Sequence, residues 1–101
     1  MTIKALNIRK SNNTPLDVSW ELSGGSQSSY ELFLIREGSI IEMAKSTGEA
    51  MKCTLHTIVE PMKEYALLLT VKSGKLLSSV RAGFIPDKDA PLYQSVTYQT
   101  S

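Results

Sequence analysis

The sequence predicts an all-β fold, an antiparallel β-sandwich of about seven short strands. Over most of the chain, apolar residues alternate with polar ones, which is the period of a strand with one buried face. Turn residues interrupt this pattern roughly every 8–12 residues, a spacing typical of sandwiches. The two segments with some helical character, 40–45 and 60–65, are too short and lack a cap. A chain of 101 residues has the size of one domain.

The expected strands in the first half of the chain are residues 3–8, 16–22, 30–35 and 40–43. The second strand is the clearest, because every second residue from Leu16 to Leu22 is apolar and the residues between them are polar. Gly24 and Gly25 then predict a flexible turn. Gly38 predicts a hairpin turn between the third and fourth strands.

The expected strands in the second half are residues 51–55, 65–72 and 80–84. Met51 and Leu55 mark the apolar face of the first, and Val80 and Phe84 that of the last. The turn at 73–75 separates the last two strands. These three strands complete the predicted sandwich.

The chain is expected to divide into a sandwich at residues 1–86 and a linker or tail at residues 87–101. After the last predicted strand, the segment 85–91 contains two prolines and several charged residues, as linkers do. The segment 92–101 is therefore expected to be a loose tail or the first strand of a following domain.

The segment around Pro61 and Tyr65 indicates which kind of sandwich this is. In immunoglobulin-like sandwiches, a tyrosine at the start of the sixth strand folds back, and its hydroxyl bonds the backbone a few residues upstream. Pro61 suits such a bend because it fixes φ and needs no hydrogen-bond donor. The Tyr65 hydroxyl is expected to satisfy a backbone carbonyl there. Together with Trp20 and Tyr30, this order of aromatic residues resembles a fibronectin type III domain over about residues 3–86.

A narrower resemblance is found in residues 19–32, whose sequence is SWELSGGSQSSYEL. It is similar to the N-terminal β-sandwich domain of bacterial α-L-rhamnosidases, in which a "SWxL" strand, a polar turn and a "QxxYxI"-like strand follow one another. Residues 44–49 are similar to the "DSGK" turn that comes next. The sixth strand, 65–72, departs from the family, because it lacks the second tyrosine and both tryptophans of "YYWRVRVWD". The resemblance implies a non-catalytic module of a large glycoside hydrolase, whose acid and base belong to a later helical barrel.

Composition argues against several classes of partner. The 11 basic and 10 acidic residues give a net charge of +1, whereas nucleic-acid binders gather a basic excess on one face. Cys53 is the only cysteine, so no internal disulfide can form, which fits a reducing compartment. No apolar run has the length of a signal peptide or a membrane span. We therefore expect a cytoplasmic protein with neither nucleic acid nor membrane as partner, although a piece of a longer secreted protein would show the same features.

Three residues suggest chemistry but have a simpler structural explanation. Trp20 could stack on a sugar, yet its place in the alternating strand predicts that it is a core residue. His56 is the only histidine, and Cys53 lies three residues before it. On a strand, residues three apart point to opposite faces, and zinc requires three or four ligands. Neither a metal nor another cofactor is expected.

Carboxylates on the polar faces of the strands could be read as the acid and base of a glycosidase. Such a pair needs burial and a cleft between the two groups, and the positions of these residues predict solvated charges instead. They are Glu21, Glu31, Glu42 and Glu60. No catalytic residue is expected, and the chain is not predicted to be an enzyme.

An interaction surface is the one functional feature that the sequence favours. Phe33, Ile35 and Leu68 lie on the face opposite the core set of their strands, and the third and sixth strands are neighbours in this fold. A cluster of apolar residues on the outside of a sheet usually contacts another domain or chain. Tyr93 and Tyr98 of the expected tail could extend the cluster.

The expected function is that of a non-catalytic accessory module, used for spacing or docking within a larger glycoside hydrolase such as an α-L-rhamnosidase. Its partner would be a neighbouring domain of the same chain or another protein. The alternative is a stand-alone adhesion module, or one that binds carbohydrate, on a cell-surface or phage protein.

Overall fold

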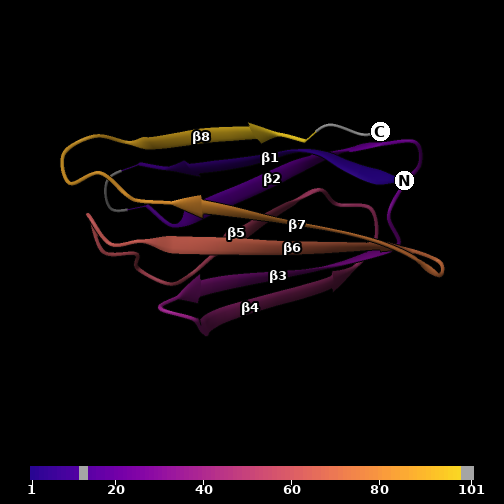
Figure 1. Cartoon of the computed structure of the whole chain (residues 1–101), viewed down its shortest axis with the longest axis horizontal. Helices are drawn as coiled ribbons and strands as arrows, with labels where there is room; N and C mark the ends of the chain where they lie inside the picture. The colour runs from indigo at the N-terminus through magenta and orange to yellow at the C-terminus, as the bar shows by residue number, and fades with distance from the viewer. Residues whose placement is uncertain (12–13, 99–101) are drawn as a thin grey trace.

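Two four-stranded antiparallel sheets pack face to face in the computed structural model (Figure 1). The structure describes residues 1–11 and 14–98, and within these ranges the chain forms strands, turns and loops but no helix. No membrane-spanning helix is thus found in the described part of the chain. The strands are β1 (Thr2–Lys10), β2 (Leu16–Ser23), β3 (Ser29–Arg36), β4 (Ser39–Thr47), β5 (Lys52–Leu55), β6 (Tyr65–Ser73), β7 (Leu76–Phe84) and β8 (Leu92–Thr97).

The first sheet has the strand order β5-β2-β1-β8, and the second has the order β4-β3-β6-β7. This arrangement confirms the predicted all-β antiparallel sandwich. It is also compatible with the immunoglobulin-like and fibronectin type III class, in which the third, sixth and seventh strands share a sheet.

The segment expected to be a linker or tail contains an eighth strand. β8 pairs with β1 over a continuous register from Ala5 and Thr97 to Lys10 and Leu92. The physical reason is that β1 would otherwise leave a row of N–H and C=O groups open at the edge of the first sheet. Residues 99–101, the end of the expected tail, lie outside the described residues.

Side chains of β8 and of Tyr98, directly after it, also reach β7, the edge strand of the second sheet. The Gln94 Nε2 atom donates to the Gly83 carbonyl at 2.8 Å, and the Tyr98 hydroxyl donates to the Arg81 carbonyl at 3.3 Å. Two acceptors on the open side of β7 are therefore taken by side chains. β8 thus covers β1 and becomes the edge strand of the first sheet, while these side-chain bonds occupy part of the edge of β7.

Three strands differ in extent from their prediction. β4 continues through Lys45 to Thr47, which were expected to form a polar break, and β7 begins at Leu76 instead of residue 80. Both strands lie at edges and are exposed on two faces in these parts, so they carry no alternating pattern. Met51 precedes β5 and is exposed, although it was expected on the buried face.

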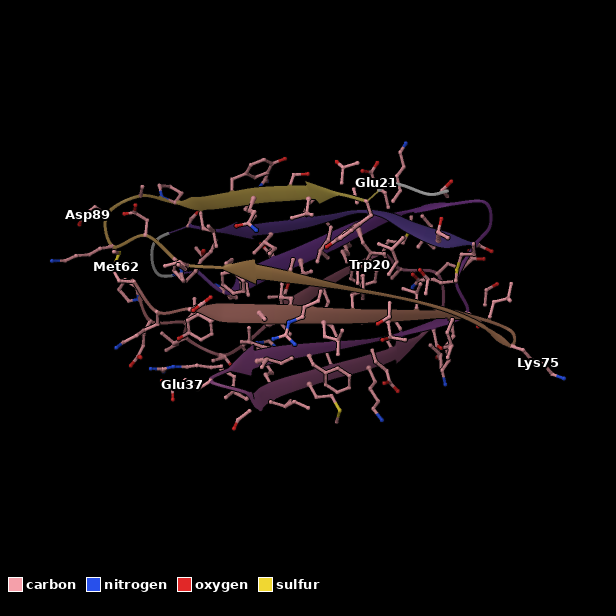
Figure 2. All side chains as sticks on the ribbon, in the orientation of Figure 1. Trp20, Glu21, Glu37, Met62, Lys75 and Asp89 are labelled. Carbon is pink, nitrogen blue, oxygen red and sulfur yellow. The ribbon has the colours of Figure 1, made fainter. Side chains whose placement is uncertain are left out.

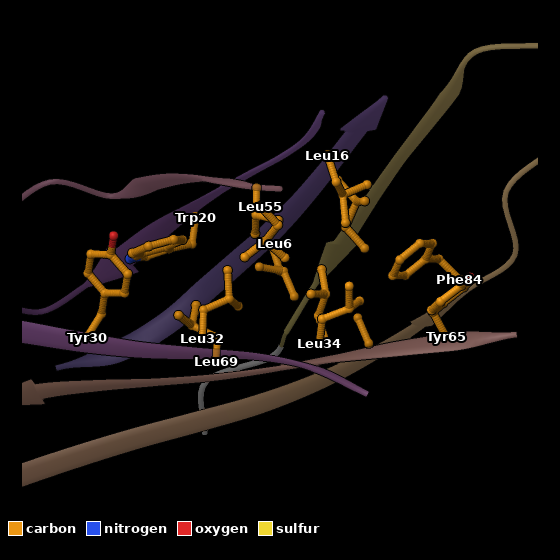
Figure 3. Packing of buried hydrophobic residues seen from close by; sticks show 14 of the residues in the cluster. Leu6, Leu16, Trp20, Tyr30, Leu32, Leu34, Leu55, Tyr65, Leu69 and Phe84 are labelled. Atoms are coloured by element: carbon orange, nitrogen blue, oxygen red, sulfur yellow. The ribbon is translucent and has the colours of Figure 1, made fainter. Parts of the chain in front are cut away.

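The core lies between the two sheets and contains the residues that the alternating patterns predicted. Figure 3 shows Leu6 and Leu16 of the first sheet facing Leu32 and Leu34 of the second. All four are completely buried.

Aromatic pairs occupy the two ends of this core (Figure 3). Trp20 is 2% exposed and meets the Tyr30 ring edge-on, with 4.8 Å between the ring centroids. Tyr65 stacks on Phe84 at 5.6 Å. The core assignment of Trp20 is confirmed, so its ring is closed to sugar.

Gln27 is a buried polar residue that the sequence pattern did not single out. Its Oε1 atom accepts a hydrogen bond of 2.8 Å from Trp20 Nε1, and its Nε2 atom donates to the carbonyls of Gly48 and Ala50 at 3.2 and 2.8 Å. Burial of an amide is tolerated because these three bonds satisfy it. Gln27 therefore ties β2 and the turn after it to the connection between β4 and β5.

The Tyr65 hydroxyl bonds the backbone upstream, as predicted, but to a different group. It accepts a hydrogen bond of 2.8 Å from the Glu60 N–H, whereas a carbonyl partner was expected. A phenol can donate or accept, so the spacing alone does not fix which backbone group it meets. The bond still anchors the bend that leads into β6.

The chain enters and leaves the domain at the same end. The Tyr98 N–H donates to the Lys4 carbonyl at 2.8 Å, so the last described residue lies beside the start of β1. Figure 2 shows Lys75 at this end, and Glu37, Met62 and Asp89 at the opposite end, which we call the distal end. This geometry follows from the eighth strand, which returns the chain to where it began (Figure 1).

Candidate functional site

The outer face of the second sheet carries the three residues predicted to form an interaction surface. Phe33 of β3 lies directly opposite Leu68 of β6 on one side and opposite Met43 of β4 on the other. Opposite residues in an antiparallel pair share a face and approach closely. These three side chains therefore form one apolar row across three strands.

A second row lies next to the first, nearer the distal end. Ile35 of β3 is opposite Ala66 of β6 and Ile40 of β4. The two rows together make up the outer patch, which we define as Phe33, Ile35, Ile40, Met43 and Leu68.

The predicted members of the outer patch differ in exposure from the members that the sequence did not reveal. Phe33, Ile35 and Leu68 are half-buried by their neighbours. Ile40 and Met43 are 59% and 55% exposed. β4 is an edge strand without an alternating pattern, so only its pairing with β3 shows that these two residues belong to the surface.

Polar residues border the outer patch. Lys45 and Glu31 form an ion pair of 3.8 Å in the next row, and Arg81 lies opposite Leu68 on β7. An apolar centre inside a polar rim is the usual anatomy of a protein interface.

The turn between β3 and β4 fixes which residues of β4 lie opposite β3 at the distal end of the outer patch. Glu37 and Gly38 have φ values of 52° and 78°, which suit a tight two-residue hairpin and favour glycine at the second position. The register then shifts, so that Ile41 is the extra residue of a bulge between the partners of Leu34 and Ile35.

Glu42 joins the edge of the second sheet to the connection after β5. Its carboxylate accepts hydrogen bonds from the His56 N–H at 2.9 Å, the Thr57 N–H at 2.7 Å and the Thr57 hydroxyl at 2.5 Å. Partial burial alone would raise the pKa of Glu42, but these bonds and the nearby His56 outweigh it and lower the pKa. The clamp holds β4 in place from its inner side.

A groove of about 620 Å³ lies at the distal end, between the loops that follow β1, β5 and β7. Its lining includes Lys10, Lys88, Asp87, His56 and Ile58. Among the described residues that line it, none is phenylalanine, tyrosine or tryptophan. The groove therefore offers mixed polar and apolar walls.

The outer face of the first sheet is polar and carries Tyr93, which is 66% exposed. The Arg9 guanidinium lies over its ring at 5.4 Å. Asn7 and Ser95 bond each other beside it at 2.6 Å. Tyr93 is thus not part of the outer patch, and Tyr98 packs against the core, so the expectation that either extends the patch is wrong.

The residues considered for catalysis or metal binding do not come together. Within residues 1–11 and 14–98, no group of three or more histidine, cysteine or acidic residues could hold a metal ion. The Cys53 side chain is half-buried and His56 is exposed. Glu60 forms an ion pair of 2.8 Å with Arg36, whose guanidinium also lies 5.7 Å from the centre of the Tyr65 ring.

Comparison with known proteins adds no family to this description. Neither the protein-family models nor the curated proteins contain a match to the chain.

Proposed function

We propose that this chain is a non-catalytic docking module, which holds a protein surface against the outer patch. The observation that carries the proposal is the pair of apolar rows across β4, β3 and β6, bordered by charged residues. Apolar surface contributes about 25 cal/mol per Å² when it is removed from water. Five clustered apolar side chains therefore favour a partner that covers them.

The position of the chain ends favours docking over spacing. A spacer adds length between the segments on either side of it, which requires that the chain enter and leave at opposite ends. Here Lys4 and Tyr98 are hydrogen-bonded neighbours, so segments attached to them emerge side by side. Such a module sits as a protrusion on a larger body and leaves the outer patch free to fold back onto it.

We further propose that the module is of the fibronectin type III kind and belongs to a bacterial glycoside hydrolase such as an α-L-rhamnosidase. The similarity of residues 19–32 to the N-terminal domain of those enzymes supports this assignment. Gln27 and Trp20 both lie in this segment, and the hydrogen bond between them in the core gives these two similar positions a structural role. The partner of the outer patch would then be a neighbouring domain of the same polypeptide.

The test uses the complete polypeptide encoded by the natural reading frame, in its wild-type form and with Phe33→Ser and Leu68→Ser combined. A docked module unfolds together with its neighbour, so calorimetry should show one shared transition for the wild type. The double variant should show a separate transition for the module. Its intrinsic stability should change by only about 1 kcal/mol per substitution, because cross-strand surface pairs contribute about 0.2–1 kcal/mol each.

The matched control is the combination of Leu76→Ser and Leu77→Ser. These residues are 61% and 62% exposed near the β6–β7 turn, away from the outer patch. The control should keep the shared transition. Docking through the outer patch is wrong if the wild type already unfolds in two independent steps, or if the control separates the transitions as the patch variant does.

A further inference from the structure

The outer edge of β4 is open along a long strand with apolar side chains. In the described part of the chain, β4 pairs with β3 alone. It is nine residues long, and Ile40, Ile41 and Met43 are all exposed along it. Long exposed apolar edges invite pairing with another strand, and proteins usually protect them.

The other edges offer less to a partner strand. On β7, side chains of Gln94 and Tyr98 occupy two carbonyls. β5 has only four residues. β8 also ends its sheet with an unpaired edge, but its outward face is polar, with Arg9 lying over Tyr93. β4 is therefore the edge at which a strand can be added together with apolar side chains.

We propose that a second copy of this chain adds to β4, by antiparallel pairing of the two β4 strands about a two-fold axis at Met43. The β4-β3-β6-β7 sheet of one copy and the same sheet of the other would then form one continuous sheet across the interface. This goes beyond the proposed function, because it adds a contact at the edge of β4 that continues the outer patch into the second copy and leaves the outer face of the sheet uncovered.

The register of the strands supports a second copy as the occupant. Leu68, Phe33 and Met43 already form one cross-strand row that ends at the open edge. A two-fold axis at Met43 places the same row of the second copy directly after it, with methionine against methionine. The contact is then self-complementary, as a two-fold interface must be.

Charges along β4 are compatible with this pairing. With Met43 on the axis, Lys45 of one copy lies opposite Ile41 of the other, and Glu42 lies opposite Ala44. No like charges face each other, which would destabilise a strand pair. Glu42 is also held by Thr57 from the inner side, so the strand is fixed in position before a partner arrives.

Sedimentation equilibrium of the 101-residue chain measures the pairing directly. A contact made by one strand edge is small, and small interfaces are weak. The weight-average mass should rise from 11.1 kDa toward twice that value as the concentration rises from about 10 μM to about 1 mM.

Charge substitutions at the axis provide the decisive comparison. Met43→Lys places two ammonium groups against each other across the axis, and Met43→Glu places two carboxylates there. Each variant alone should remain monomeric at about 1 mM, because each dimer would oppose like charges. An equimolar mixture of the two should associate again, since opposite charges then meet.

Leu77→Lys is the matched control, since Leu77 has a similar exposure but lies on β7. It should associate like the wild type. The pairing is overturned if the wild type stays monomeric at the highest concentration, if the control is as defective as the Met43 variants, or if the mixture fails to associate. The sedimentation masses do not depend on the shared unfolding transition that calorimetry measures for the complete polypeptide. Docking to a neighbouring domain and pairing with a second copy can therefore fail separately.

Discussion

Replacing Gln27 with alanine should be among the most damaging polar substitutions in this chain. The change removes the acceptor of the Trp20 indole N–H, which lies in the core with its ring 2% exposed. A buried donor left without a partner costs about 1–3 kcal/mol. The carbonyls of Gly48 and Ala50 also lose a donor, but both residues are exposed, so water can replace the amide there.

The expected loss is therefore about 2–3 kcal/mol of unfolding free energy, with the lost packing of the side chain included. For a domain of this size, this corresponds to a fall in Tm of about 10–20 °C. Urea unfolding followed by circular dichroism measures the loss, and an unchanged m value would show that the unfolded state is not involved.

A double-mutant cycle with Trp20→Phe tests whether the indole N–H is the cause. Phenylalanine has no N–H to orphan, so Gln27→Ala should cost at least about 1 kcal/mol less in that background. The reasoning is refuted if Gln27→Ala is within about 0.5 kcal/mol of the wild type, or if its cost is the same in both backgrounds.

Two further predictions concern hydrogen bonds at the distal half of the domain. The pKa of Glu42 is lowered from its ordinary value of 4.5, so the clamp contributes stability above that pH and loses it as the pH falls through the folded-state value. Urea melts between about pH 3 and 7 should show a shallower acid loss for Glu42→Gln than for the wild type, and equal slopes would contradict the clamp. Tyr65→Phe should cost about 1–2 kcal/mol in the same assay, because the Glu60 N–H loses its acceptor; a change near zero would mean that water replaces the hydroxyl fully.

The two-sheet architecture could be predicted because the central strands are buried on one face only. Every second residue from Leu16 to Trp20 is apolar and buried, and the sheet partners of these strands follow from the sandwich class. Phe33 and Leu68 could be placed opposite each other for the same reason, since their strands are neighbours in such a sandwich.

The edge strands could not be predicted in this way. β8 carries Gln94 between its two apolar residues Leu92 and Val96, because that side chain serves β7 instead of the core. β4 is exposed on both faces, so its sequence shows no period. Ile40 and Met43 consequently entered the candidate surface only through the observed register.

Gln27 was hidden by its surroundings, since it stands among serines and glycines that indicate a turn. Only its place three residues before Tyr30 set it apart. That spacing does not show that the side chain turns inward. The partner of the Tyr65 hydroxyl was equally undetermined, because a phenol can use either kind of backbone group.

The position of β8 beside β1 also decides how the domain responds to mechanical tension. Lys4 of β1 and Tyr98, directly after β8, are hydrogen-bonded neighbours, so a force that separates the two chain ends acts across the ladder of hydrogen bonds instead of along it. The β1–β8 hydrogen bonds then bear the load one pair after another, and not all at once as they would in shear. Peeling would begin at the Lys4–Tyr98 bond, pass to the Ala5–Thr97 pair and release β8 before the strands of the core are strained. Because Gln94 and Tyr98 leave together with β8, the same pull would uncover the edge of β7.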